Sequence, residues 1–480
     1  MTRRFDRRFD RRFDPCVMAA LALGLSVVTI AFGERIGING GQGWDGMGYV
    51  LWSRAWNTEV LGKGVTVYHA QRILPSALIH YAGFQDTIFG FQVLNVVMMT
   101  GTMVLWERTA KRLPRAASWA GFVALLLGFA SARHALYYPT LTDPTAMFLG
   151  MAAVWAYLED RPVPQLAVAL VAAFTWPALT PLSLAMLVLR NRAVPPVDAR
   201  WIRWAAVAIP VAAATLVCVA AARWLHHPYP GEDKWVVIVH RSLLPVTYAW
   251  IFAMVALGLH LVLRERTLWN VRAYARALWT PRLAFALAGC AIVVVLQQLW
   301  LRRVATRGSG PTFDQFQCEH LLAALRGPLW GVVHHVVYFG PIVLLAIAVW
   351  RRIAKLPWGP AGALGLAMIV AFAVGSQSRQ MIHLAPLLVT ATITATASWW
   401  TTRRVLVFAA LYLAWSKLWW KIGYDQPLKW SEWPNQRYFM TQGPWASDEM
   451  FLVHLGGVIV TAIALVLLFR HARNTEPTAT

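Results

Sequence analysis

A single carboxylate stands among glycines in the polar stretch that follows the first apolar run of the chain. Asp45 lies in GWDGMGYVLW, with Gly43, Gly46 and Gly48 around it and Tyr49 four residues later. Because glycine leaves little bulk beside the backbone, a substrate can approach such a carboxylate closely. A carboxylate in this setting can act as a general base toward a hydroxyl group. The alternative role is structural, since aspartate is also a common N-cap of the helix that follows.

A second acid, Asp143, occupies a similar place in YYPTLTDPTAMF, directly before an apolar run. Asp-Pro at a helix start is common in purely structural settings, so a capping role is again the alternative. Two acids at the outer ends of neighbouring membrane spans can nonetheless face one cleft. One of them would then act as a base, and the other would orient a substrate or a divalent cation.

The basic side chains with the best setting for phosphate lie late in the chain. Arg379 stands in GSQSRQMIHLAP with His383 four residues later, a spacing that predicts one shared helical face. The planar fork of arginine matches phosphate oxygens, and a histidine beside it adds a donor. Arg72 is a weaker candidate for the same role. Tyr49 and Arg133 are candidates for substrate contacts, and the alternative for the arginines is snorkelling at the membrane interface.

Several other kinds of site have no support in the sequence. The neighbouring pairs Glu319-His320 and His334-His335 lack the spacing of a zinc site, and we predict no metal centre built from them. The chain has no Walker loop, no GxGxxG before a helix and no GxSxG elbow. Its four cysteines show no disulfide pattern.

The composition indicates a polytopic membrane protein. Of 480 residues, 58% are hydrophobic and 14% charged, 26 are tryptophan, and the mean hydropathy is +0.49. A soluble domain of this length does not have such a composition. The formal net charge of +22 comes largely from arginines in short loops between apolar runs, where the positive-inside rule places them. We therefore expect no nucleic-acid partner.

The N-terminus holds three copies of Arg-Arg-Phe-Asp ahead of an apolar run at 16–32. Because such basic residues stay in the cytoplasm, this run predicts a signal anchor with residues 1–14 cytoplasmic. Further runs approach the ~20 residues that a membrane helix needs, and they predict a membrane domain over 15–470 and a cytoplasmic tail at 471–480. These runs are 87–106, 117–132, 145–158, 163–189, 204–222, 243–263, 283–301, 332–350, 361–374, 381–400, 405–420 and 451–469.

The long run at 163–189 determines the topology of everything after it. It contains Pro177 and Pro181, and the loop that follows is rich in arginine. A single crossing would put this basic loop outside, against the positive-inside rule. The run is therefore interpreted as two short helices that meet near 175–181 at the outer face. The prediction is an all-α bundle of about 12–14 membrane segments with both termini cytoplasmic.

In this topology residues 33–86 form the first extracytoplasmic loop. After Asp45, apolar residues that include Trp52 and Trp56 recur on one side at helical spacing, as in a helix that rests in the membrane interface. A second such helix is predicted over 69–81, with Pro75 in its first turn. An acid and basic groups would thus be held where a lipid headgroup lies.

Four pieces in this order are similar to a known family. They are GWDGMGYVLWSRA, YHAQRILPSALIHY, LTDPTAMFL and GSQSRQMIHLAPLLV. The chain resembles the GT-C superfamily of multi-spanning glycosyltransferases, in the branch of bacterial mannosyl- and aminoarabinosyl-transferases that use polyprenyl-phosphate sugars. The resemblance implies a GT-C-like helical fold in a bacterial inner membrane. It also implies a polyprenyl-phosphate-sugar donor, surrounding membrane lipids, and a glycan, lipid or protein as acceptor.

The resemblance assigns roles to four residues. The family's catalytic acid falls on Asp45 and its second-loop acid on Asp143, while the phosphate-binding role falls on Arg379 and less securely on Arg72. Two departures stand out. Asp45 is followed by Gly46 where many members carry two adjacent acids, and this departure argues against dependence on a divalent cation. No soluble extracytoplasmic C-terminal domain follows the spans, which argues against peptide glycosylation by the oligosaccharyltransferase route.

The predicted topology gives the same function independently. The acids lie outside, where nucleotide sugars are not available, so a glycosyl donor must arrive attached to a lipid. The hypothesis is that Asp45 removes a proton from an acceptor hydroxyl while Arg379 and Arg72 stabilise the departing lipid phosphate. A single displacement of this kind inverts the anomeric centre.

Three alternatives stay open on the sequence. A transporter or flippase for a lipid-linked substrate would use the break at 175–181 as a midplane site. A polysaccharide polymerase or ligase would use Arg302 and Arg303 in the late outer loop. A non-enzymatic assembly partner would use the aromatic-rich loop at 421–450 as its contact surface.

Overall fold

The computed structural model describes residues 14–43, 45–56, 67–189, 194–226, 241–277, 281–304, 321, 324–325, 327–375, 377–419 and 448–470. Throughout these ranges the regular elements are helices, and no strand occurs among them. This confirms the predicted all-α class. Residues 1–13, most of the loop after Arg303, the segment 420–447 and the tail 471–480 lie outside the described residues, so the predictions made for them stay predictions.

Six helices in the described ranges are long and apolar enough to cross a membrane, and these helices indicate a multi-pass membrane protein. The total is eight when each of two bent helix pairs counts as one span, which is fewer than the 12–14 segments predicted. The six are α1 (Asp14–Phe32), α6 (Thr87–Ala110), α12 (Arg200–His226), α13 (Leu244–Leu263), α15 (Pro281–Val304) and α22 (Asp448–Phe469).

Several predicted spans form helices that are shorter than a full crossing. The run at 163–189 is divided as predicted, into α10 (Pro162–Ala173) and α11 (Thr180–Val188) with a turn of 3-10 helix between them. Pro177 and Pro181 sit in the first turns of the elements they begin, where a missing N–H costs nothing. The others are α9 (Asp143–Leu158), α19 (Gly359–Ala373), α20 (Ala385–Ala395) and α21 (Thr402–Ser416).

The predicted span at 332–350 is strongly bent. The chain forms α17 (Trp330–Phe339) and α18 (Ile342–Ile353), whose axes differ by 112°. Gly340 has a φ of 81°, and a Cβ there would lie 2.4 Å from the ring of Tyr412. Only glycine accommodates both conditions without strain. The other bent pair is α7 (Arg115–Leu126) with the segment Ala130–Tyr137, at 49°.

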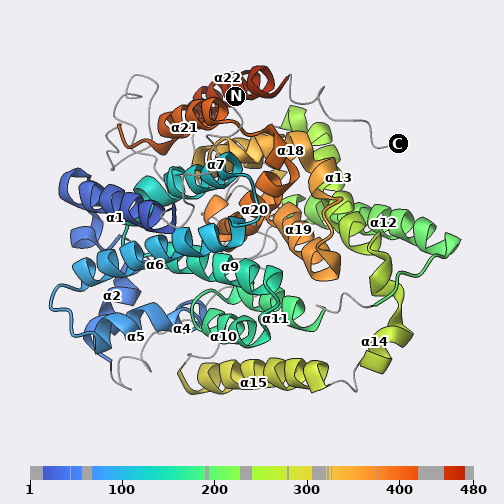
Figure 1. Cartoon of the computed structure of the whole chain (residues 1–480), viewed down its shortest axis with the longest axis horizontal. Coiled ribbons are helices and arrows are strands. Elements are labelled where there is room, and N and C mark those ends of the chain that lie inside the picture. The colour runs from blue at the N-terminus through green and yellow to red at the C-terminus, as the bar shows by residue number, and fades with distance from the viewer. Residues whose placement is uncertain are drawn as a thin grey trace, which may run out of the picture.

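The centre of the molecule is α9, which is buried along nearly its whole length. It packs against α6, α10 and the 3-10 helix η8 (Ser378–Leu384), and Figure 1 shows it beside α6 in the middle of the molecule. Gly150 permits the contact with η8, because a Cβ there would lie 2.1 Å from the carbonyl oxygen of His383. This packing brings together segments that are more than 200 residues apart in the sequence.

The described part of the first loop contains the 3-10 helix η2 (Ile38–Gly41) and the short α-helices α2 (Gly46–Arg54), α4 (Val67–Ala70) and α5 (Ile73–Tyr81). Helices at 46–54 and 73–81 fit the predicted pattern, but the apolar residues of α2 do not share one face. Val50 and Trp52 are buried while Met47 and Leu51 are exposed, because α2 packs against α5. The location of these helices in a membrane interface stays a prediction.

Candidate active site

Asp45 is held at the start of α2 by the loop that precedes α9. The Gly46 N–H donates to the Tyr138 hydroxyl at 3.3 Å. A Cβ on Gly46 would lie 2.0 Å from Thr140 Oγ1, and a Cβ on Gly43, which has a φ of 67°, would overlap the Tyr138 ring. These glycines therefore permit close packing of two loops, and not only the approach of a substrate.

The Asp45 carboxylate is not a helix cap. It occupies the N-cap position of α2, but its side chain accepts no capping hydrogen bond, so the structural alternative is wrong in this respect. The side chain is 41% exposed. A carboxylate that is free of capping and reachable from solvent meets the first requirement for a base.

Asp143 has the opposite setting, since its side chain is only 2% exposed. Both of its oxygens accept from Arg379, Oδ1 from Nε at 3.0 Å and Oδ2 from Nη2 at 3.1 Å. Burial alone would raise the pKa of Asp143, but the charge and hydrogen bonds of Arg379 outweigh this and hold the pKa below its usual value. Asp143 is therefore a buried partner that fixes Arg379, and neither a cap nor an available base.

Tyr338 and His134 complete the surroundings of Asp143. The Tyr338 hydroxyl donates to Asp143 Oδ1 at 3.2 Å and also lies 3.1 Å from His134 Nδ1. Because the hydroxyl has one proton to donate, this arrangement requires His134 to present Nδ1–H to the tyrosine oxygen. Sequence reasoning missed Tyr338, which lies among apolar residues of α17 and carries no local signal of this role.

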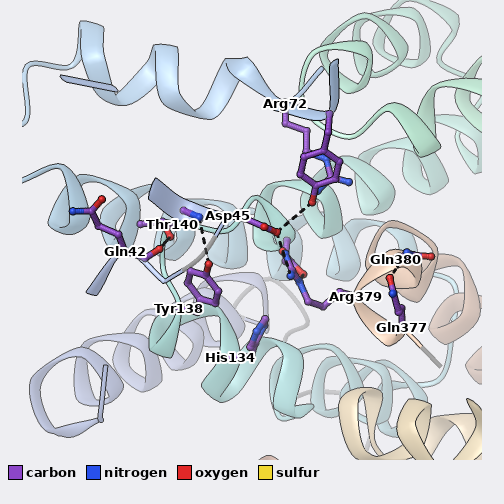
Figure 2. Close-up of polar contacts among 12 residues, drawn as sticks. Gln42, Asp45, Arg72, His134, Tyr138, Thr140, Gln377, Arg379 and Gln380 are labelled. Atoms are coloured by element: carbon purple, nitrogen blue, oxygen red, sulfur yellow. Dashed lines mark hydrogen bonds and ion pairs between the residues drawn. The ribbon is translucent and has the colours of Figure 1, made fainter. Parts of the chain in front are cut away.

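Arg379 lies between the two acids. Its Nη1 is 4.0 Å from Asp45 Oδ2, on the side opposite to the Asp143 contacts, and Figure 2 shows the side chains of Asp45 and Arg379 directed toward each other. The guanidinium thus occupies the place that a cation bridging the two acids would take. No group of three metal-ligating side chains occurs in the described part of the chain, and the possible use of a divalent cation stays a prediction.

Arg72 differs from Arg379 because, within the described ranges, it forms no ion pair with a carboxylate. Its guanidinium lies 4.1 Å from the ring centroid of Tyr68 and 4.2 Å from that of Trp176. Its Nη1 donates to the Tyr68 hydroxyl at 2.7 Å. Stacking on both rings fixes the guanidinium without a direct ion pair to a described carboxylate. Arg72 is therefore better placed than Arg379 to receive an anion.

Tyr68 connects this cation to the exposed acid. Its hydroxyl accepts from Arg72 and donates to Asp45 Oδ2 at 3.4 Å. Burial raises the pKa of Tyr68 above its ordinary value, so the phenol keeps its proton near neutral pH. Neither Tyr68 nor Trp176 was predicted from the sequence. Tyr68 lies four residues before Arg72 in the sequence. This spacing, at which helical side chains are neighbours, is the signal that could have indicated a contact between the two.

His383 does not join Arg379. The segment is a 3-10 helix, in which residues four apart point about 120° away from each other rather than along one face. His383 Nδ1 instead accepts from Trp176 Nε1 at 2.8 Å. Burial lowers the pKa of His383 to about 3, so the ring is neutral and able to accept this bond. His383 thus supports Trp176, and through it Arg72.

The two predicted substrate contacts are both buried. Tyr49 is 1% exposed, and its ring packs at 5.4 Å from that of His69 while its phenol is close enough to Arg72 to feel its charge. Arg133 Nη2 donates to Glu34 Oε2 at 2.9 Å, which ties the loop after α1 to the second loop. The structure therefore gives both residues packing partners within the protein.

No family model, no curated protein and no solved structure matches the chain. Fold and site define an all-helical multi-pass membrane protein. Its candidate site joins an exposed acid, an acid–arginine pair and a stacked arginine.

Proposed function

We propose that this protein is an integral-membrane glycosyltransferase of GT-C type that moves a sugar from a polyprenyl-phosphate donor to an acceptor hydroxyl. The acceptor class is a glycan, lipid or protein. In this proposal the site faces the extracytoplasmic side of a bacterial inner membrane, and both termini are cytoplasmic.

One observation supports the proposal most directly. The Tyr68 hydroxyl contacts both the Asp45 carboxylate and the Arg72 guanidinium, so a base and an unpaired cation lie within reach of one small ligand. Transfer from a lipid phosphate needs both groups, one for the acceptor proton and one for the leaving phosphate.

The proposed step is a single displacement. The acceptor oxygen forms a bond to the anomeric carbon while its proton moves to an Asp45 carboxylate oxygen. The bond between the anomeric carbon and the phosphate oxygen breaks, and its electron pair stays on the phosphate, whose charge Arg72 balances. Arg379, held by Asp143, positions Asp45 without taking part in the bond changes. The configuration at the anomeric carbon is inverted.

An apolar cleft beside η8 suits the lipid part of such a donor. It has a volume of about 330 Å³ and lies between α13, α18 and α19, with Met381 of η8 among its lining residues. Its lining along α18 extends from Val343 to Ala354, a length of roughly 16 Å at the rise of an α-helix. That is about half of the ~30 Å hydrocarbon core of a bilayer. Met381 and Arg379 belong to the same short helix, η8, so one element contributes both to the cleft and to the charged site.

The alternatives have less support from the geometry. The break between α10 and α11, which a transporter would use as its substrate site, places Trp176 against Arg72 and so already serves the candidate site. Arg302 and Arg303, which a polymerase or ligase would use, are exposed at the end of α15. The loop that follows them, and the loop that a non-enzymatic partner would offer, lie largely outside the described residues.

Substitution of the proposed base tests the proposal. Membranes containing wild-type protein or Asp45→Asn are supplied with a polyprenyl-phosphate pool carrying radiolabelled sugar, and transfer of label to any acceptor is followed. We expect transfer to fall by about 10²–10⁴-fold, the usual contribution of a general base. Asp86→Asn is the matched control, because Asp86 is an exposed acid that caps α6 through Ile88 and Phe89 and lies outside the site. Full transfer by Asp45→Asn at equal protein level would exclude this mechanism.

A further inference from the structure

We propose that Lys417, His334 and His454 form a second anion site, separate from the site at Asp45, that takes a phosphate group. The three side chains come from the end of α21, from α17 and from α22. The glycosyl-transfer step described above uses none of them, so this proposal does not depend on that function.

Lys417 is held in an unusual way. It follows the last residue of α21 with a φ of 55° and a ψ of 20°, in the left-handed region. A residue other than glycine is strained in this conformation. The side chain is nonetheless 6% exposed, and its Nζ has no hydrogen-bond partner in the described part of the protein. The nearest compensation is the ring of Phe129, whose centroid is 5.2 Å from Nζ.

The two histidines place further basic groups at the same point. His334 is 0% and His454 4% exposed, and His454 lies close enough to both Lys417 and His334 to feel their charges. Aromatic rings enclose the group: Trp330 packs on His334 at 5.2 Å and Trp415 on His454 at 6.2 Å. Within the described ranges no carboxylate forms an ion pair with Lys417. The cluster therefore gathers three basic side chains among aromatic rings.

The backbone adds to this preference for an anion. The first turns of α17 and α22 meet, since the rings of Trp330 and Phe451 stack at 4.3 Å. The N-terminus of α17 carries the positive end of its helix dipole, whereas the first turn of α22 carries the acid Asp448. A bound phosphate would pair with the Lys417 ammonium, which has no hydrogen-bond partner in the described part of the protein.

Phe129 separates this cluster from the candidate active site. One contact of its ring is Lys417, and its others include Tyr338 at 6.1 Å and His134 at 5.9 Å, both of which belong to the surroundings of Asp143. A phosphate at Lys417 is therefore a different group from one bound by Arg72. Free phosphate and the phosphate of a lipid headgroup share this chemistry, and the experiment distinguishes them.

The test measures binding of radiolabelled inorganic phosphate to the full chain in a maltoside detergent. Arg72→Met is present throughout, so that any phosphate bound is not at the proposed donor site. Adding Lys417→Met should weaken binding by roughly tenfold or more, as expected for loss of a charged hydrogen-bond donor. Lys417→Arg should retain it. If the Arg72→Met chain binds no phosphate, or binds equally with Lys417→Met, the proposal is wrong.

Thermal unfolding gives a second readout that does not depend on the binding assay. In phosphate-free buffer Lys417→Met should melt at a higher temperature than wild type, because it removes an unpaired buried charge. Phosphate should raise the melting temperature of wild type and not that of the variant. A variant that unfolds at lower temperature and still responds to phosphate would contradict the site.

Competition with an anionic lipid shows whether the site binds a lipid headgroup or a water-soluble phosphate. The chain is placed in nanodiscs of phosphatidylcholine with or without phosphatidic acid, and displacement of inorganic phosphate is measured. Displacement by phosphatidic acid assigns the site to a lipid headgroup, and retention of inorganic phosphate assigns it to a water-soluble phosphate. Either result supports the site, provided that Lys417→Met weakens the binding by roughly tenfold or more.

Discussion

Two buried regions of this protein hold charge in opposite ways. At the Asp45 site two carboxylates face two guanidiniums, and Arg379 has Asp143 and Asp45 as neighbours. At the Lys417 cluster, defined by Lys417, His334 and His454, the three groups are all bases, and the ammonium lies against the ring of Phe129 with no hydrogen-bond partner among the described residues. One aromatic residue, Phe129, lies between the two regions.

The difference shows which charged groups are paired within the protein and which have no carboxylate partner among the described residues. A charge removed from water is stable only when it is paired and hydrogen-bonded. Asp143 and Arg379 meet this condition within the protein, so they form a rigid base for the site. Arg72 and Lys417 do not meet it within the described residues, and both are therefore candidates for binding an external anion.

The largest effect should come from breaking the ion pair between Asp143 and Arg379. Arg379→Leu leaves Asp143 buried without its partner, which should destabilise the protein by about 3–5 kcal/mol. Thermal or denaturant unfolding in detergent measures this. The double variant Asp143→Leu/Arg379→Leu should be clearly more stable than the sum of the two single effects predicts. Additive losses would show that the two side chains do not act as a pair.

Removing the unpaired guanidinium should affect function more than stability. Arg72→Met should lower sugar transfer by about 10²–10³-fold, the cost of losing one donor to developing charge, with a modest change in melting temperature. Arg54→Met is the matched control, because Arg54 is a nearby exposed arginine that donates to Thr87 Oγ1 outside the site. Equal transfer by both variants would remove Arg72 from the mechanism.

Displacing Asp45 from its packed position should have an intermediate effect. In Gly46→Ala the new Cβ would meet Thr140 Oγ1 at 2.0 Å, so the loop must shift at a cost of about 1–3 kcal/mol. Gly37→Ala is the control, since nothing lies within 4 Å of a Cβ there. The free energy of unfolding and the rate of sugar transfer should both fall in Gly46→Ala and should not change in Gly37→Ala. A Gly46→Ala protein as stable as Gly37→Ala would mean that the two loops are not closely packed.

The smallest effect should be a dependence of stability on pH at His383. The pKa of His383 is about 3 in the folded protein, and its ordinary value is 6.5. Between pH 6.5 and pH 3 the imidazole is therefore protonated in the unfolded chain and neutral in the folded protein. The contribution of His383 is therefore complete above pH 6.5 and is lost as pH falls toward 3, by at most ~1.4 kcal/mol per pH unit. Unfolding of wild type and His383→Gln at pH 5 and pH 7.5 measures it.

Glutamine can still accept the hydrogen bond from Trp176, so the variant should keep the packing while losing the titration. The difference in stability between the two pH values should be smaller in His383→Gln than in wild type. An unchanged difference would assign the acid sensitivity to other groups.

Much of the fold could be predicted because it depends on local pattern. Long apolar runs bounded by arginines predict helices, and Pro177 and Pro181 predict the break between α10 and α11. The bend at Gly340 could not be predicted, because it depends on the distant ring of Tyr412. The assumption of α-helical geometry at 379–383 failed for a similar reason, since packing against α9 fixes that segment as a 3-10 helix.

The sequence by itself determined which side chains to examine: Asp45, Asp143, Arg72 and Arg379 are conspicuous because charge is costly beside apolar spans. Tertiary structure alone decided their partners. Asp143 and Arg379 are 236 residues apart in the chain, and only the packing of η8 on α9 brings them within hydrogen-bond distance. That contact made Arg379 a structural partner and left Arg72, stacked between two aromatic rings, as the available cation. Side-chain type is a local property, whereas charge compensation depends on which distant groups the fold brings together.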